Sequence, residues 1–266
     1  SRGLGDVYKR QVLYVNEARK MNSFIRKIKV KNTEISSFKE WEHAFHDSIH
    51  WKEGRSAYSL ADFVINRNGI ERITEILGRC GFIGLQLLSC QVETSVKFDD
   101  YKRPSQRDMI LTGELKNSDR VFITVEAKVD ESFGKTIGNS IISQSSHRAK
   151  ELLKKFIPYY KDQDKKLRYQ LFHATAATIE KGDYGQNFQI SIMLVLVFKT
   201  KGYGNGVDYN EEKSQKNFSD FKDYMQAIGA KKIIDKEPYV WSLNYNGKEV
   251  VFIYSQIEHK NLQIKE

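Results

Sequence analysis

Two acidic residues and one lysine stand where a β-ribbon could bring them together. In Val121–Val129 the odd positions are all apolar, whereas the even positions include Glu126 and Lys128. Alternate residues of a strand point to the same face, so Glu126 and Lys128 should project together from an otherwise buried strand. Residues 117–119 (Asn-Ser-Asp) predict a turn just before it. This turn places Asp108 opposite Glu126 or Lys128, with Cβ atoms about 4.5–5.5 Å apart.

Such a cluster has a definite chemical use. Two neighbouring carboxylates form the kind of hard-oxygen site that Mg²⁺ or Mn²⁺ takes, and a cation there can acidify water and offset charge on a phosphodiester. We therefore expect Asp108 and Glu126 to hold the metal, and Lys128 to position the water or stabilise the additional negative charge. Glu93, on the polar side of the preceding predicted strand, is a candidate third ligand, with a solvated strand residue as the alternative.

The Glu-x-Lys pattern alone is weakly specific. It occurs four times, at residues 114–116, 126–128, 211–213 and 258–260. Only the second occurrence is embedded in an apolar strand with an acid predicted across a hairpin. The alternative interpretation is an exposed strand face whose charges form surface pairs that contribute little to stability.

The elements that must position these residues alternate between helix and strand. Strands are predicted within 22–31 and over 88–98, 108–115, 121–129, 190–198 and on both sides of Asn246-Gly247, and helices over 37–49, 60–64, 70–77, 142–157, 166–180 and 219–228. In the second strand, Leu88, Cys90 and Val92 share one parity and predict its buried face. This order predicts an α/β fold in which a mixed central β-sheet is flanked by helices.

Composition narrows the class of protein. The chain has 266 residues, a net charge of +9, 40% hydrophobic residues and 29% charged residues. These values fit a globular protein with a substantial core and exclude a disordered tail. No stretch approaches 18 uncharged apolar residues, so we expect no membrane partner. With only two cysteines and no secretory leader pattern, we expect a reduced, cytoplasmic protein.

The first eleven residues differ in character from the rest of the chain. Residues 6–11 resemble the in-frame translation of a transposon end used to build sequencing libraries, so we treat 1–11 as a non-native segment. No linker or internal repeat divides the remaining residues. The sequence therefore predicts a single domain over residues 12–266.

Several polar residues could bind a polyanion. Lys102, Arg103 and Arg107 precede Asp108, and Gln170 begins a helix that should cross the sheet. We predict that these four residues contact DNA or RNA. Further lysines and arginines dominate the two middle helices and should attract polyanions in a salt-dependent way. The alternative is that these helix faces are simply solvated.

These motifs resemble a known superfamily. Asp108, a hairpin, and Glu126-Ala127-Lys128 on a strand resemble the active-site signature of the PD-(D/E)XK nucleases, although Arg107 stands where the signature has proline. The segments 50–61, 105–108, 126–134 and 168–173 resemble an uncharacterised bacterial domain family within it. The resemblance implies a restriction-endonuclease-like core and divalent-metal phosphodiester hydrolysis, with Asp108 and Glu126 as ligands and Lys128 as base or stabiliser.

Three functions remain open at this point. The first is a metal-dependent, nuclease-like phosphodiester hydrolase acting on DNA or RNA. The second is a non-catalytic nucleic-acid-binding or interaction module on the same scaffold, which would use the basic helices. The third is a metal-dependent hydrolase of a small phosphate ester.

Overall fold

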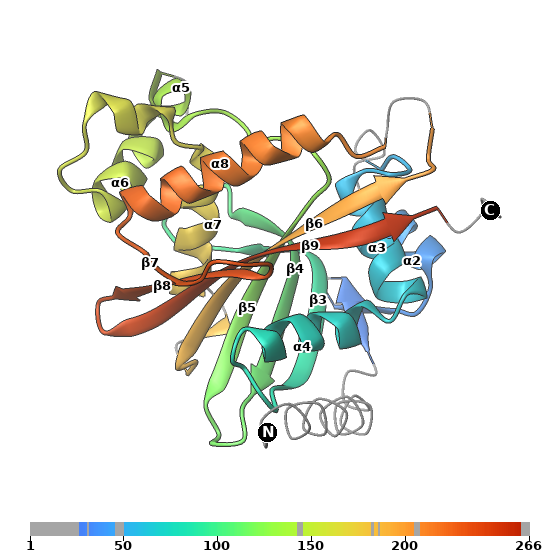
Figure 1. The fold of residues 1–266 in the computed structure, drawn as a ribbon. Coiled ribbons are helices and arrows are strands. Elements are labelled where there is room, and N and C mark those ends of the chain that lie inside the picture. Colours follow the sequence, from blue (N-terminus) through green and yellow to red (C-terminus); the bar gives the residue numbers. More distant parts are fainter. Residues whose placement is uncertain are drawn as a thin grey trace, which may run out of the picture.

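The computed structural model of the protein describes residues 27–30, 32–45, 51–142, 146–181, 184–185, 187–204 and 208–261. A nine-stranded sheet runs through this part of the chain in the order β2-β1-β3-β4-β5-β6-β9-β8-β7 (Figure 1). Helices flank the sheet on both faces, so the predicted α/β class with a mixed central sheet is confirmed. Residues 1–11, which the sequence predicts to be non-native, lie outside the described residues.

The strands pair in both directions. They are β1 (Ile28–Val30), β2 (Thr33–Ile35), β3 (Gln86–Val96), β4 (Ser105–Glu114), β5 (Arg120–Lys128), β6 (Ile190–Lys201), β7 (Lys231–Ile234), β8 (Tyr239–Tyr245) and β9 (Lys248–Lys260). The pairs β1–β3, β5–β6 and β6–β9 are parallel, and the others are antiparallel. Strand β6 lies centrally and is buried on both faces, which agrees with its apolar residues on both parities.

The helices form two layers. They are α2 (Phe38–Ala44), α3 (Ser56–Asn66), α4 (Gly69–Arg79), α5 (Ile137–Ile142), α6 (Ser146–Phe156), the 3₁₀ turn η1 (Asp162–Lys166), α7 (Tyr169–Glu180) and α8 (Glu211–Ala227). Helix α2 starts at the predicted capping box of Ser37 and Glu40. Helix α8 starts eight residues before the predicted position, because the Asn210 side chain accepts from the Lys213 amide and caps it there.

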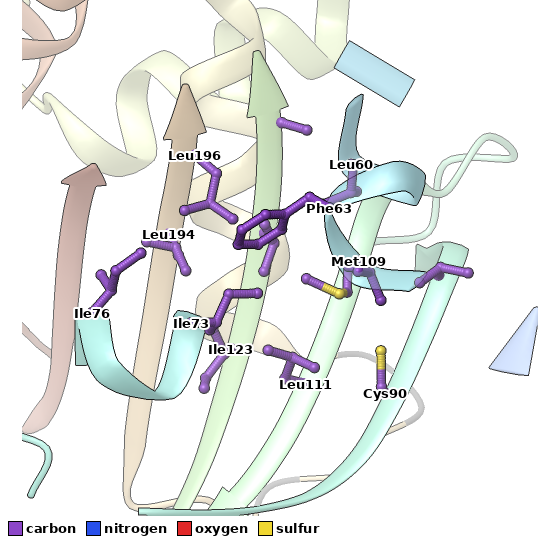
Figure 2. Packing of buried hydrophobic residues seen from close by; sticks show 14 of the residues in the cluster. Leu60, Phe63, Ile73, Ile76, Cys90, Met109, Leu111, Ile123, Leu194 and Leu196 are labelled. Atoms are coloured by element: carbon purple, nitrogen blue, oxygen red, sulfur yellow. The ribbon is translucent and has the colours of Figure 1, made fainter. Parts of the chain in front are cut away.

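Helices α2, α3 and α4 form one layer, which packs against the sheet. Figure 2 shows Phe63 of α3 and Ile73 of α4 among apolar side chains from the strands, including Met109, Ile123 and Leu194. The odd positions of β5 all belong to this core, as their alternation predicts. Helices α5 to α8 pack on the opposite face and form a second core with the other side chains of β6 and β9.

Two features of the strands differ from the prediction. A bulge between Leu87 and Ser89 shifts the pairing of β3 with β4, so Leu87 is buried whereas Leu88 is 47% exposed. The predicted burial of Leu88 is therefore wrong, because one additional residue reverses the alternation of sides. Strands β2 and β7 were not predicted, since these short edge strands are mostly exposed and have no apolar alternation.

Candidate active site

Strand β5 presents Glu126 and Lys128 side by side. The Lys128 Nζ atom donates to Glu126 Oε1 at 2.7 Å. Both side chains are buried, with Glu126 4% and Lys128 8% exposed, under the helical layer that contains α7. An exposed strand face with solvated charges does not describe this arrangement, since burial leaves the two charges only weakly screened.

Asp108 lies opposite Glu126 on the neighbouring strand. The backbone pairing of β4 with β5 reaches Met109 and Val125, and one residue further along the same register Asp108 faces Glu126. The predicted hairpin register is therefore confirmed. The Asp108 Oδ2 atom accepts from the Ala127 amide at 2.6 Å, so the carboxylate is fixed to the strand that carries Glu126.

Glu126 is the centre of a buried hydrogen-bond network. Besides Lys128, it accepts from Arg107 Nη1 at 3.0 Å on Oε2 and from Gln170 Nε2 on Oε1. Arg107 is 4% exposed, and its Nε atom has no hydrogen-bond partner among the described residues. The sequence predicted that Arg107 and Gln170 contact nucleic acid; the structure turns both side chains inward onto Glu126.

Glu93 approaches the cluster from β3. The pairs Val92–Met109 and Thr94–Arg107 on either side of it place Glu93 across from Asp108. Its φ of 48° is left-handed, which is unusual for a residue in a strand. The Trp41 Nε1 atom donates to Glu93 Oε1 at 3.3 Å, and Glu93 is partly buried, so it is not a freely solvated strand residue.

The pKa values separate these carboxylates. Burial, followed by the charge of Glu126, raises the pKa of Asp108 to about 7, although Lys128 and Arg107 oppose the shift. Burial and the charge of Asp108 raise the pKa of Glu93 to about 8. Burial also acts to raise the pKa of Glu126, but Lys128 and Arg107 outweigh it and lower that pKa. The cluster thus holds three acids against two cations.

This donor set fits a hard divalent cation. Within the described part of the chain, no group of three or more His, Cys, Asp or Glu side chains is arranged to hold a metal ion. Mg²⁺ needs fewer protein ligands, because it commonly takes one or two carboxylates and keeps several waters. Asp108 and Glu126 are the two that could hold it, since a cation beside Asp108 would offset the charge that burial and Glu126 disfavour.

The remaining predicted residues lie outside this cluster. Lys102 and Arg103 are exposed in the loop between β3 and β4, and neither side chain is hydrogen-bonded to Asp108 or Glu126. Glu131, just after the motif, connects β5 to α3, because its Oε1 accepts from the Ser56 amide at the start of α3. This contact joins residues 75 positions apart. No local sequence signal could have indicated it.

The chain belongs to a family described as "Domain of unknown function (DUF6946)", whose model matches residues 34–259. No curated protein matches the sequence, and no solved structure does. Among the described residues, no helix has both the length and the apolar character needed to span a bilayer.

Proposed function

We propose that the protein is a metal-dependent phosphodiester hydrolase that cleaves DNA or RNA, with a PD-(D/E)XK-type active site on a restriction-endonuclease-like core. The observation that carries this proposal is the convergence of Asp108, Glu126 and Lys128, which come from two strands of one hairpin. Glu126 and Lys128 are buried, and Asp108 beside them is partly buried. Of the four Glu-x-Lys triplets, this is the one whose glutamate and lysine are both buried.

Each residue has a distinct part in the proposed chemistry. Bound between Asp108 and Glu126, a divalent cation would acidify a water molecule and offset negative charge on the phosphodiester. The Ala127 amide holds Asp108, while Arg107 and Gln170 hold Glu126, so both carboxylates are oriented before substrate arrives. The Lys128 ammonium is fixed beside them and stabilises negative charge that develops on the phosphate.

Cleavage and metal binding test the proposal together. Wild-type protein should cleave labelled DNA or RNA with Mg²⁺ or Mn²⁺, and Glu126→Gln should not. The metal alone should also raise the melting temperature of the wild type, by about 3–5 °C at ten times its Kd, and raise that of Glu126→Gln less. Glu114→Gln is the matched control, because it alters a Glu-x-Lys triplet at the far end of β4. Absence of cleavage of every polynucleotide tested, together with no thermal shift, would contradict the proposal.

The rival is a non-catalytic nucleic-acid-binding module. One observation favours it: both Glu126 oxygens already accept hydrogen bonds, from Arg107 on one side and from Lys128 and Gln170 on the other. A network satisfied in this way can act purely as a structural one. Nucleic-acid binding that depends on salt but not on metal, and that survives Glu126→Gln, would support the rival.

A further inference from the structure

A buried arginine fixes the loop that leads into the candidate active site. We call residues 97–104, between β3 and β4, the β3–β4 loop. Arg148 of α6 is 7% exposed and donates two hydrogen bonds to Asp99, from Nε at 2.7 Å and from Nη2 at 2.9 Å. Its Nη1 atom donates to the Arg103 carbonyl at 2.7 Å. One side chain therefore holds the loop at two points.

Aromatic rings complete the attachment. The Arg148 guanidinium lies 4.5 Å from the ring centroid of Phe98 and 5.4 Å from that of Tyr101. The Tyr101 hydroxyl donates to Glu151 of α6 at 2.9 Å. A bidentate pair with stacked rings is a geometry that lysine cannot reproduce. Because Asp99 neutralises Arg148, the arginine orders the loop without adding charge to its surface.

The ordered loop and α6 present an excess of positive charge. Five basic residues are exposed here, whereas two acidic residues, Asp100 and Glu151, are exposed beside them. The basic residues are Lys97, Lys102, Arg103, Lys150 and Lys154. Such a surface complements a chain of phosphates, and its attraction does not depend on base sequence.

This surface is connected to the carboxylate cluster. Arg103 precedes Asp108 by five residues, a span of at most about 17 Å in extended chain. The Phe98 ring packs edge-on against His173 at 4.9 Å, and His173 lies one helical turn from Gln170, which bonds Glu126. Burial, Arg148 and Arg107 together lower the pKa of His173 to about 3, so the loop anchor and the cluster share a neighbour.

We propose that the β3–β4 loop, together with the exposed face of α6, binds the sugar–phosphate backbone of nucleic acid and guides it to Asp108 and Glu126, with Arg148 as the positioning residue. The proposal rests on the proposed function in that its ligand is the substrate of that site. Lys102 and Arg103 touch phosphates, and Arg148 acts only through the loop.

Binding without cleavage tests this surface directly. A fluorescent DNA duplex and an RNA duplex of the same sequence are titrated in EDTA at several salt concentrations. Lys102→Ala/Arg103→Ala should bind about tenfold more weakly at 0.1 M salt, and the slope of log K against log salt should become shallower by about 2. Lys231→Ala/Lys236→Ala removes the same charge at the opposite edge of the sheet and should bind as the wild type does.

The positioning role of Arg148 is tested with a separate variant. Asp99→Asn/Arg148→Met removes the anchor without changing net charge, so binding should weaken severalfold while the salt slope stays at the wild-type value. In cleavage assays KM should rise more than kcat falls. An altered slope, or binding equal to that of the wild type, overturns the positioning role.

The outcomes for the loop and for the cluster can be told apart. Weaker binding of the Lys102→Ala/Arg103→Ala variant supports the loop surface even if the wild type cleaves nothing, a result that would count against the proposed hydrolase alone. Equal binding by this variant and by the control at the far sheet edge overturns the loop surface, whatever the cleavage result. A wild type that binds neither duplex overturns the loop surface, whereas the hydrolase is judged by cleavage and by the thermal shift with metal.

Discussion

Two clusters of buried charge lie on opposite faces of the sheet, and they differ in how far the charges of their carboxylates are neutralised. In the first, Asp62 of α3 is met by Arg67 at 2.6 Å, by Asn66 at 2.8 Å and by His259 at 3.2 Å. Burial acts to raise the pKa of Asp62, but these neighbours lower it to about 2. Every charge there has a partner, as expected of an ion pair that serves the fold.

In the second cluster, around Glu126, neighbouring cations neutralise the carboxylates less completely. Glu126 has its partners, whereas Asp108 and Glu93 have pKa values raised to about 7 and about 8 by burial first and by a neighbouring carboxylate second. A fold has no need to bury acids in this way, since apolar residues would pack the same space at lower free energy. The difference agrees with the binding or chemistry proposed for the Glu126 cluster.

A large effect on the cleavage rate should come from removing the amine of the second cluster. Lys128→Met keeps most of the side-chain volume but removes the charge, and should lower the single-turnover cleavage rate with Mg²⁺ by about 10²–10³-fold. Lys116→Met is the control, because it alters the triplet at residues 114–116 and should cleave normally. A Lys128→Met protein that cleaves at the wild-type rate would remove lysine from the mechanism.

A substitution in the first cluster should change the stability of the fold. Asp62→Asn should lower the free energy of unfolding by about 2 kcal/mol at pH 7, because a folded-state pKa near 2 lies well below the ordinary value. The contribution of Asp62 is complete above pH 4 and is lost as the pH falls toward 2, so the two proteins should converge in acid. Urea unfolding at several pH values measures this difference.

A surface acid provides the comparison for Asp62. Asp162 pairs with Lys165 at 2.7 Å, but its side chain is 94% exposed. Asp162→Asn should therefore leave the free energy of unfolding nearly unchanged at any of these pH values. If Asp62→Asn were equally silent, the view of the first cluster as a structural ion pair would be wrong.

For Asp108 we expect the opposite effect on the free energy of unfolding. Asp108→Asn retains an oxygen that can accept from the Ala127 amide, yet it removes a charge that burial and Glu126 disfavour. Stability should therefore be unchanged or higher by up to about 1 kcal/mol, while cleavage and the thermal shift with Mn²⁺ are lost. A loss of more than 1 kcal/mol in urea unfolding would place Asp108 with Asp62, among the residues that hold the fold.

The geometry of the hairpin was predictable, because it depends on local signals. The turn at residues 117–119 and the alternation in β5 fix which side chains share a face. The sequence alone therefore predicted that Asp108, Glu126 and Lys128 lie together. The same reasoning gave the hairpin at Asn246-Gly247, whose two central residues both have positive φ.

The partners of Glu126 could not be predicted in this way. Gln170 reaches it from α7, 44 residues further along the chain, and Arg107 reaches it from β4, 19 residues earlier. No periodicity encodes such contacts. The bulge at Leu87 and Ser89 and the left-handed backbone of Glu93 are also invisible to a pattern that assumes regular alternation.

The smallest effect is expected for Glu93, and it tests whether this residue belongs to the second cluster. Glu93→Gln keeps the length of the side chain and an oxygen for the Trp41 indole, and removes only the carboxylate charge. Stability should rise by less than about 1 kcal/mol, since the charge is partly buried and faces Asp108. If Glu93 is a third ligand, the Mn²⁺-induced thermal shift should also shrink. If the shift is unchanged, the cation is held by Asp108 and Glu126 alone, and the left-handed backbone at Glu93 serves only to place its carboxylate beside Trp41.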